Sequence, residues 1–159
     1  MQVRAVTPED LAQLLPLIHA LARFHGDTPL ADADSLESDV QGSDPWVHVL
    51  VAEDDGALVG YVAVLRLARF QYGQRGIDLH HVYVNDSHRG RGVGGALVGA
   101  ALDLGARLGA SYATVTATPA NVAAQKFYAS LGFAPAPRFG ARFGIMIPKS
   151  ERPDAADRA

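Results

Sequence analysis

The chain has 159 residues, of which 48% are hydrophobic and 19% are charged, with a formal net charge of -3 and no cysteine. This composition is typical of one folded domain, argues against nucleic acid as a partner, and excludes a disordered chain, a disulfide framework and a cysteine-ligated zinc site. We expect a single domain over residues 1–149 and a disordered tail over 150–159. The expected location is the reducing cytoplasm. No contact with a membrane is expected, since no stretch reaches the ~20 apolar residues of a membrane span.

The first half of the chain predicts a strand, two helices and a hairpin. Thr7 followed by Pro8 is typical of a helix start, because threonine caps free N–H groups and proline suits the first helical position. Asp55-Gly56 lies between two valine-rich runs and favours a hairpin, because both residues tolerate positive φ. We predict strands over 3–6, 46–52 and 58–67, a helix from Thr7 with Leu11, Leu14, Leu15, Ile18 and Leu21 inward, and a short helix around Ser35, Leu36 and Val40.

The second half alternates strands with helices. Runs of β-branched and apolar residues indicate strands, and an Ala/Leu-rich stretch between two of them indicates a helix. We predict strands over 77–84, 112–118 and 139–147 and helices over 90–108 and 121–130. The resulting order β-α-α-β-β-β-α-β-α-β describes an α/β fold built on a mixed sheet.

A glycine-rich turn joins a predicted strand to a predicted helix, with the sequence Arg89-Gly90-Arg91-Gly92-Val93-Gly94-Gly95. Without side chains in the way, successive backbone N–H groups at a helix start can face an anion, and the arginines add positive charge. A phosphate or pyrophosphate is therefore the expected ligand. The turn is no P-loop, because Ala96 stands where a P-loop has lysine, and no acid follows ~20 residues on as a dinucleotide fold requires.

This turn resembles the acetyl-CoA signature of the GNAT superfamily, Arg/Gln-x-x-Gly-x-Gly/Ala, read from Arg89 to Gly94. The second GNAT signature is matched at the expected distance by Asn121, Ala124, Phe127, Tyr128, Leu131, Gly132 and Phe133. The resemblance is sharp in its motifs only over residues 78–133. It implies an acetyl-CoA-dependent N-acetyltransferase whose central strand pair splays apart.

The resemblance also implies which residues hold acetyl-CoA. The strand before the turn would pair its free backbone groups with pantetheine, and the turn would hold the pyrophosphate. Asn121 would meet the pantetheine or acyl region from the opposite side, while Arg91 would hold the 3′-phosphate or face solvent. The expected binding residues are Val82, Tyr83, Val84, Arg89, Gly90, Arg91, Gly92, Val93, Gly94, Gly95 and Asn121.

By the same resemblance, the substrate amine attacks the thioester directly, without a covalent enzyme intermediate. Tyr128 occupies the position of a general acid for the CoA thiolate, although a packing role is the alternative. His80 and His81 stand where many relatives have Glu-Asp, so His80 is our candidate base, with His81 or a water relay as alternatives. Strand alternation predicts that the two histidines face opposite sides, which leaves one structural and argues against a metal site.

The acceptor is less well defined by the sequence. Between Arg23 and Arg66 there is no lysine or arginine but there are many acids, which favours a small cationic amine, whereas capping and solubility explain such acids equally well. The alternatives are a protein N-terminus or lysine as acceptor, and a non-catalytic acyl-CoA-binding or sensing domain. A homodimer is an expectation from the resemblance alone.

Overall fold

The computed structural model of this chain describes residues 1–135 and 145–146. Its elements are β1 (Gln2–Ala5), α1 (Leu11–His25), α2 (Ala33–Val40), β2 (His48–Asp54), β3 (Ala57–Arg69), β4 (Gln74–Val84), α3 (Val93–Arg107), β5 (Tyr112–Val115) and α4 (Val122–Ser130). The predicted strand over 139–147 and the predicted tail over 150–159 lie outside the described residues, except that Ile145 and Met146 are described and belong to no strand. None of the described helices has the length and apolarity needed to cross a bilayer.

Within residues 1–135, the strands form one five-stranded mixed sheet in the order β1-β2-β3-β4-β5. The strands β1 to β4 pair with one another in antiparallel order, and β5 runs parallel to β4. The hairpin between β2 and β3 is confirmed: Asp55 and Gly56 have φ values of 49° and 78°, which are the positive angles that a tight two-residue hairpin turn requires. The α/β fold class and the predicted element order are therefore confirmed through α4.

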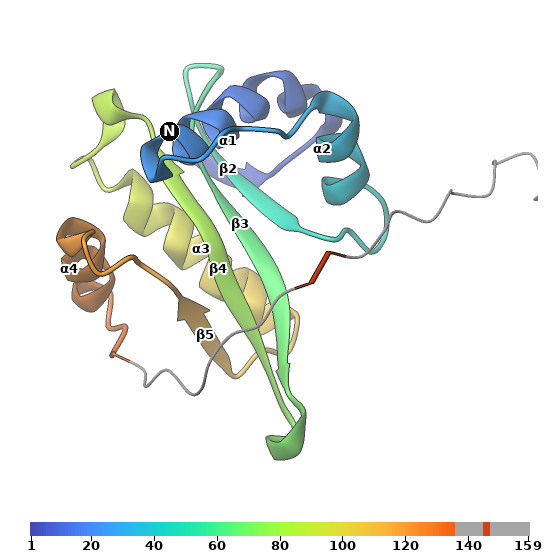
Figure 1. Cartoon of the computed structure of the whole chain (residues 1–159), viewed down its shortest axis with the longest axis vertical. Coiled ribbons are helices and arrows are strands. Elements are labelled where there is room, and N and C mark those ends of the chain that lie inside the picture. Colours follow the sequence, from blue (N-terminus) through green and yellow to red (C-terminus); the bar gives the residue numbers. More distant parts are fainter. Residues whose placement is uncertain (136–144, 147–159) are drawn as a thin grey trace, which may run out of the picture.

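Helices cover both faces of the sheet, and each face has its own core (Figure 1). On one face, α3 packs on the central strands through Val93, Leu97, Val98 and Ala101. On the other face, α1 and α2 pack through Leu14, Leu17, Leu21 and Leu36. The predicted inward face of α1 is confirmed for Leu14 and Leu21, while Leu11, Leu15 and Ile18 are partly buried at its border. The two cores fix the sheet between α3 and the α1–α2 pair.

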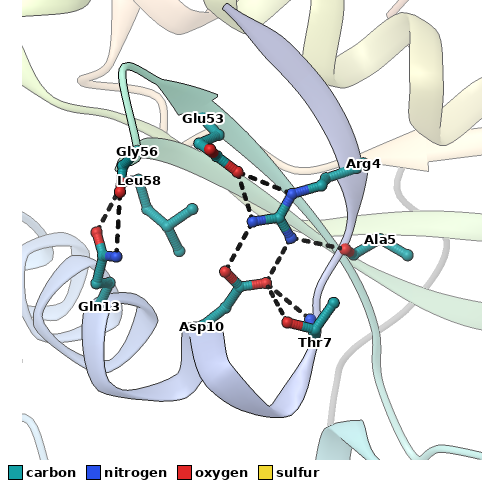
Figure 2. Close-up of polar contacts among 8 residues, drawn as sticks. All are labelled: Arg4, Ala5, Thr7, Asp10, Gln13, Glu53, Gly56 and Leu58. Atoms are coloured by element: carbon teal, nitrogen blue, oxygen red, sulfur yellow. Dashed lines mark hydrogen bonds and ion pairs between the residues drawn. The ribbon is translucent and has the colours of Figure 1, made fainter.

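The start of α1 is tied to the sheet by one arginine (Figure 2). Arg4 on β1 donates to both carboxylate oxygens of Asp10, at 2.6 and 2.9 Å, and twice to Glu53 Oε2, at 2.6 and 2.9 Å. The backbone N–H and the hydroxyl of Thr7 also donate to Asp10. This Arg4 neighbourhood lowers the pKa of the buried Asp10 carboxyl to about 2. The predicted helix start at Pro8 is thus a 3₁₀ turn, Pro8–Asp10. Asp10 binds this turn to Arg4 of β1, and Arg4 also binds Glu53 of β2.

Candidate active site

The strands β4 and β5 separate after a short paired stretch. Their parallel register covers only residues 76–79 of β4, whereas β4 itself continues to Val84 (Figure 1). The amide of Asn85 donates to Val59 O on β3 at 2.8 Å, and the polar groups of successive strand residues alternate in direction. The backbone groups of Val84 and Val82 therefore point to the side that β5 has left, as the splayed strand pair requires. This open edge of β4 can pair with an extended ligand.

The open edge leads into the glycine-rich turn. Gly90 and Gly92 have φ values of 72° and 84°, which other residues rarely adopt, so α3 begins at Val93 and not at the predicted residue 90. Among the described residues, the first N–H of this segment with a carbonyl partner is that of Ala96, which donates to Gly92 O at 3.0 Å. The N–H groups of residues 90–95 are left for an anion at the positive end of the α3 dipole.

The space around this turn is open where a ligand would need it. A Cβ atom added at Gly90, Gly92 or Gly95 would meet nothing within 4 Å. Gly94 has a different role, because an added Cβ would lie 3.1 Å from Cζ of Phe127. The glycine turn and the second signature on α4 are therefore packed against each other. The buried side chain of Val93 belongs to the core beneath them.

The two arginines of the turn are placed differently. Arg89 Nε donates to Val84 O at 3.0 Å, and Arg89 Nη1 lies 2.8 Å from Asp86 Oδ1. Its guanidinium also lies 5.8 Å from the ring centre of Tyr83. Arg91 is exposed and forms no ion pair within the described part of the chain. Arg91 thus has no partner in this part of the chain to give up before it meets a phosphate, whereas Arg89 already binds Val84 O and Asp86 and has only its remaining N–H groups available. The pyrophosphate role of Arg89 stays a prediction.

The residues predicted on α4 have structural contacts of their own. Asn121 Oδ1 accepts a hydrogen bond from the N–H of Ala124 at 3.0 Å, which caps α4 and leaves the side-chain amide N–H groups as donors. Tyr128 packs against Phe127 and Phe133, with ring centres 5.1 and 5.8 Å away. The phenol of Tyr128 is protonated at neutral pH, and burial raises its pKa further from neutrality.

The two histidines of β4 lie on the same face of the sheet, and the prediction that they face opposite sides is wrong. His81 pairs with Ala63 and Leu79 pairs with Val64, so His80 is an extra residue at a β-bulge. A bulge interrupts the alternation of side chains. The rings of His80 and His81 consequently stack, with centres 4.5 Å apart and planes 19° apart.

The bulge gathers polar side chains from three strands. His80 is 52% exposed, and its Nδ1 lies 3.9 Å from Asp78 Oδ2. Asp78 in turn accepts a hydrogen bond from Thr114 Oγ1 on β5 at 2.7 Å. On the other side of the pair, His81 Nδ1 lies 3.2 Å from the hydroxyl of Tyr61 on β3. No group of three metal-binding side chains is found within residues 1–135 and 145–146.

Of the two imidazoles, His80 is the one open to a substrate. Burial lowers the pKa of His81 to about 4, and the neighbouring His80 and His25 act in the same direction. Sequence reasoning missed Tyr61, which reads as one more core residue in a valine-rich strand, and His25 at the end of α1. No local pattern in the sequence links Tyr61 or His25 to β4, because the bulge at His80 has no sequence signature.

The depressed pKa of His81 predicts a loss of stability in mild acid. The pKa of His81 is about 4 in the folded chain and 6.5 as its ordinary value. Between these values the unfolded chain binds a proton that the folded chain does not. Stability is therefore fully present above the ordinary pKa and decreases as the pH falls toward about 4.

Urea unfolding at a series of pH values measures this loss. His81→Gln is the matched control, because glutamine does not titrate, and the variant is expected to show a smaller decrease in unfolding free energy between pH 6.5 and 4. Equal decreases in both proteins would contradict the assignment of this effect to His81.

Comparison with known proteins agrees with this geometry. Residues 15–133 match the model of the acetyltransferase (GNAT) family. The chain is 30% identical over 129 residues to an uncharacterized N-acetyltransferase of Mycobacterium tuberculosis, covering 81% of this chain and 70% of that relative. It is 33% identical over 102 residues to the L-methionine sulfoximine/L-methionine sulfone acetyltransferase of Salmonella typhimurium, covering 62% of this chain but only 59% of that relative.

A solved structure extends the comparison over most of the described residues. The crystal structure of the ribosomal-protein-alanine N-acetyltransferase from Brucella melitensis biovar Abortus aligns with a TM-score of 0.73 and 25% identity, covering 90% of this chain and 100% of the other. The splayed strands, the turn with its free N–H groups and the family match together lead to one conclusion. The chain belongs to the acetyltransferase (GNAT) family and is an N-acetyltransferase.

Proposed function

We propose that the protein transfers an acetyl group from acetyl-CoA to a small primary amine. One observation carries the proposal: the open edge of β4 leads directly into a turn whose N–H groups at residues 90–95 have no carbonyl partner in the described part of the chain. An extended pantetheine suits the edge at Val82, Tyr83 and Val84, and a pyrophosphate suits the turn. Arg91 and the amide donors of Asn121 are the further groups available to this ligand.

Acetyl-CoA supplies an activated acetyl thioester, and residues of the chain manage the protons. An alkyl ammonium must lose a proton before its nitrogen can attack at neutral pH. His80 accepts this proton, because it is exposed on the face of the bulge. His81 is too weak a base for this role, since its pKa of about 4 means that it would not keep the proton near neutrality. Tyr128, whose phenol is protonated at neutral pH, donates a proton to the departing sulfur as the C–S bond breaks, and the second proton that the nitrogen loses on forming the amide returns to the phenolate.

The nature of the amine follows from the charges near α1 and α2. Some acids of the amino half are already paired: Glu53 with Arg4, Asp44 with Arg66, and Asp54 with the N-terminal amine. The exposed acids of α2, Asp34, Glu37 and Asp39, form no ion pair within the described residues and favour a cationic acceptor. An amino acid is the second candidate, which is supported by the name of the Salmonella typhimurium relative.

Thermal unfolding with and without acetyl-CoA, followed by an assay of thiol release, tests the proposal. A ligand at 100 times its Kd stabilises a protein by about 2.7 kcal/mol, so the Tm is expected to rise. Thiol release is then measured with a polyamine, an aminoglycoside, free amino acids and a peptide with a free N-terminus. No rise in Tm would contradict acetyl-CoA as the ligand, and a rise without thiol release with any amine would support the binding-domain alternative.

A glycine substitution separates the turn from the rest of the fold. Gly92→Ala is expected to weaken acetyl-CoA binding at least tenfold, because its φ of 84° positions the N–H groups of the turn and alanine resists this angle. Gly109→Ala is the matched control, with a φ of 76° just beyond the other end of α3. Both variants are expected to lose ~1 kcal/mol of stability. Calorimetric titration should show weaker binding for Gly92→Ala alone, and an equal weakening in both would contradict a role of the turn.

A further inference from the structure

One buried hydroxyl beside the site has no part in the proposed reaction. Tyr61 on β3 is 1% exposed, and its only polar partner in the described part of the chain is His81 Nδ1 at 3.2 Å. A buried hydroxyl without a partner is costly, so this contact holds both side chains in place. Burial also raises the pKa of Tyr61, and the phenol keeps its proton. When that proton is donated to Nδ1, the ring proton of His81 must lie on Nε2.

The ring of His81 is fixed from two sides. Tyr61 meets it nearly edge-on, with ring centres 6.2 Å apart and planes 79° apart. His80 stacks on it with centres 4.5 Å apart. His80 itself is half exposed, and its other polar neighbour, Asp78 Oδ2, lies 3.9 Å away, which is beyond hydrogen-bond distance, while Thr114 binds the other oxygen, Oδ1. The stacked ring of His81 is therefore the contact that sets the direction of His80.

A neutral His81 suits the proposed role of His80. Besides Tyr61, the titratable groups around the histidines are Asp78 and Tyr83 on β4 and His25 at the end of α1. Arg89 lies beside Tyr83, with 5.8 Å between its guanidinium and the ring centre. A charged His81 would lie against His80 and oppose the arrival of a second proton there. When burial and Tyr61 keep His81 neutral, this repulsion is absent, and the carboxylate of Asp78 is the nearest charged group to His80.

We propose that Tyr61 and His81 are positioning residues for His80: the Tyr61 hydroxyl fixes the ring of His81, and this ring holds His80 toward the acceptor side of the bulge, ready to take the proton of the amine. The inference rests on the proposed function, in which His80 is the base. It assigns the bulge of β4 a purpose, because without the extra residue the two rings would lie on opposite faces and Tyr61 could not act on His80.

Nuclear magnetic resonance tests the positioning without any substrate. In the wild type, the nitrogen shifts of His81 are expected to report an Nε2–H tautomer, and the ring protons of His80 should be shifted by the stacked ring. Tyr61→Phe keeps the ring and removes the hydroxyl, and it is expected to change both signals. Tyr72→Phe, which alters an exposed tyrosine outside the site, is the control and should change neither. Unchanged His80 resonances in Tyr61→Phe would overturn the proposal, whether or not the chain acetylates an amine.

A double-mutant cycle tests the catalytic consequence. Tyr61→Phe is expected to lower kcat/KM for the amine about tenfold, since small displacements of a catalytic group reduce rates by such factors, with acetyl-CoA affinity unchanged. In a His80→Ala background the same substitution should cause no further loss. An equal loss in both backgrounds would overturn the proposal, because Tyr61 would then act independently of His80. A wild type that binds acetyl-CoA but releases no thiol would instead contradict the proposed function.

Discussion

Replacing Arg4 with leucine is expected to lower the free energy of unfolding by about 3 kcal/mol. The substitution leaves the carboxylate of Asp10, which is 7% exposed in its side chain, without the guanidinium that donates to both of its oxygens. Removing one partner of a buried pair is costly because the other charge stays buried. Glu53 and the 3₁₀ turn before α1 would lose their link to β1 as well (Figure 2).

Urea unfolding of Arg4→Leu and Arg66→Leu provides the comparison. Arg66 forms an ion pair with Asp44 at 2.6 Å, the same distance as the contact between Arg4 and Asp10, but the side chains of Arg66 and Asp44 are 54% and 74% exposed. Exposed pairs contribute about 0–1 kcal/mol, so Arg66→Leu should change stability little. Similar losses in the two variants would mean that burial of Asp10 is not what makes the Arg4 contacts important.

The elements of the fold are predictable because each carries a local signal. Asp55-Gly56 has the backbone freedom that a tight hairpin needs, and the glycines after β4 permit the angles of a turn before a helix. Asn121 stands directly before α4 and caps it. Such signals lie within a few residues of the feature they predict. Boundaries are less accurate where the signal is only apolar character: β5 ends at Val115, three residues before the predicted end at 118.

The geometry of the site is not predictable in this way, because it depends on contacts between distant segments. The bulge at His80 follows from the register of β4 against β3, and alternation alone predicts the wrong face for one histidine. The partners of Arg4 include Glu53, which is 49 residues away in sequence. Arg89 is recognisable as part of a motif, yet its contact with Val84 O follows from how the turn folds back on β4. Motifs thus identify the candidate residues, whereas the register determines which of them meet.

His80→Ala is expected to lower kcat/KM for amine acetylation about 100-fold while leaving the affinity for acetyl-CoA unchanged. The reason is positional: His80 is the exposed imidazole on the face of the bulge, and the open edge and turn proposed for acetyl-CoA use none of its atoms. Steady-state thiol release and calorimetric titration measure the two quantities. His88→Ala, which changes a histidine near Asp54 in the turn before Arg89, is the control and should retain most of its activity. A matching loss of acetyl-CoA affinity in His80→Ala would contradict the role of a base.

Added imidazole distinguishes a missing base from a damaged site. If His80 accepts the proton of the amine, free imidazole can enter the space left in His80→Ala and accept that proton in its place, because His80 is half exposed and its surroundings are open to solvent. Thiol release by His80→Ala should then increase with the concentration of imidazole and with the fraction of it that is neutral. Tyr61→Phe with His80 intact should show no such increase, since its base is present but displaced. Absence of rescue in His80→Ala, together with intact acetyl-CoA binding, would move the base to a water relay and leave the stacked histidines a structural role.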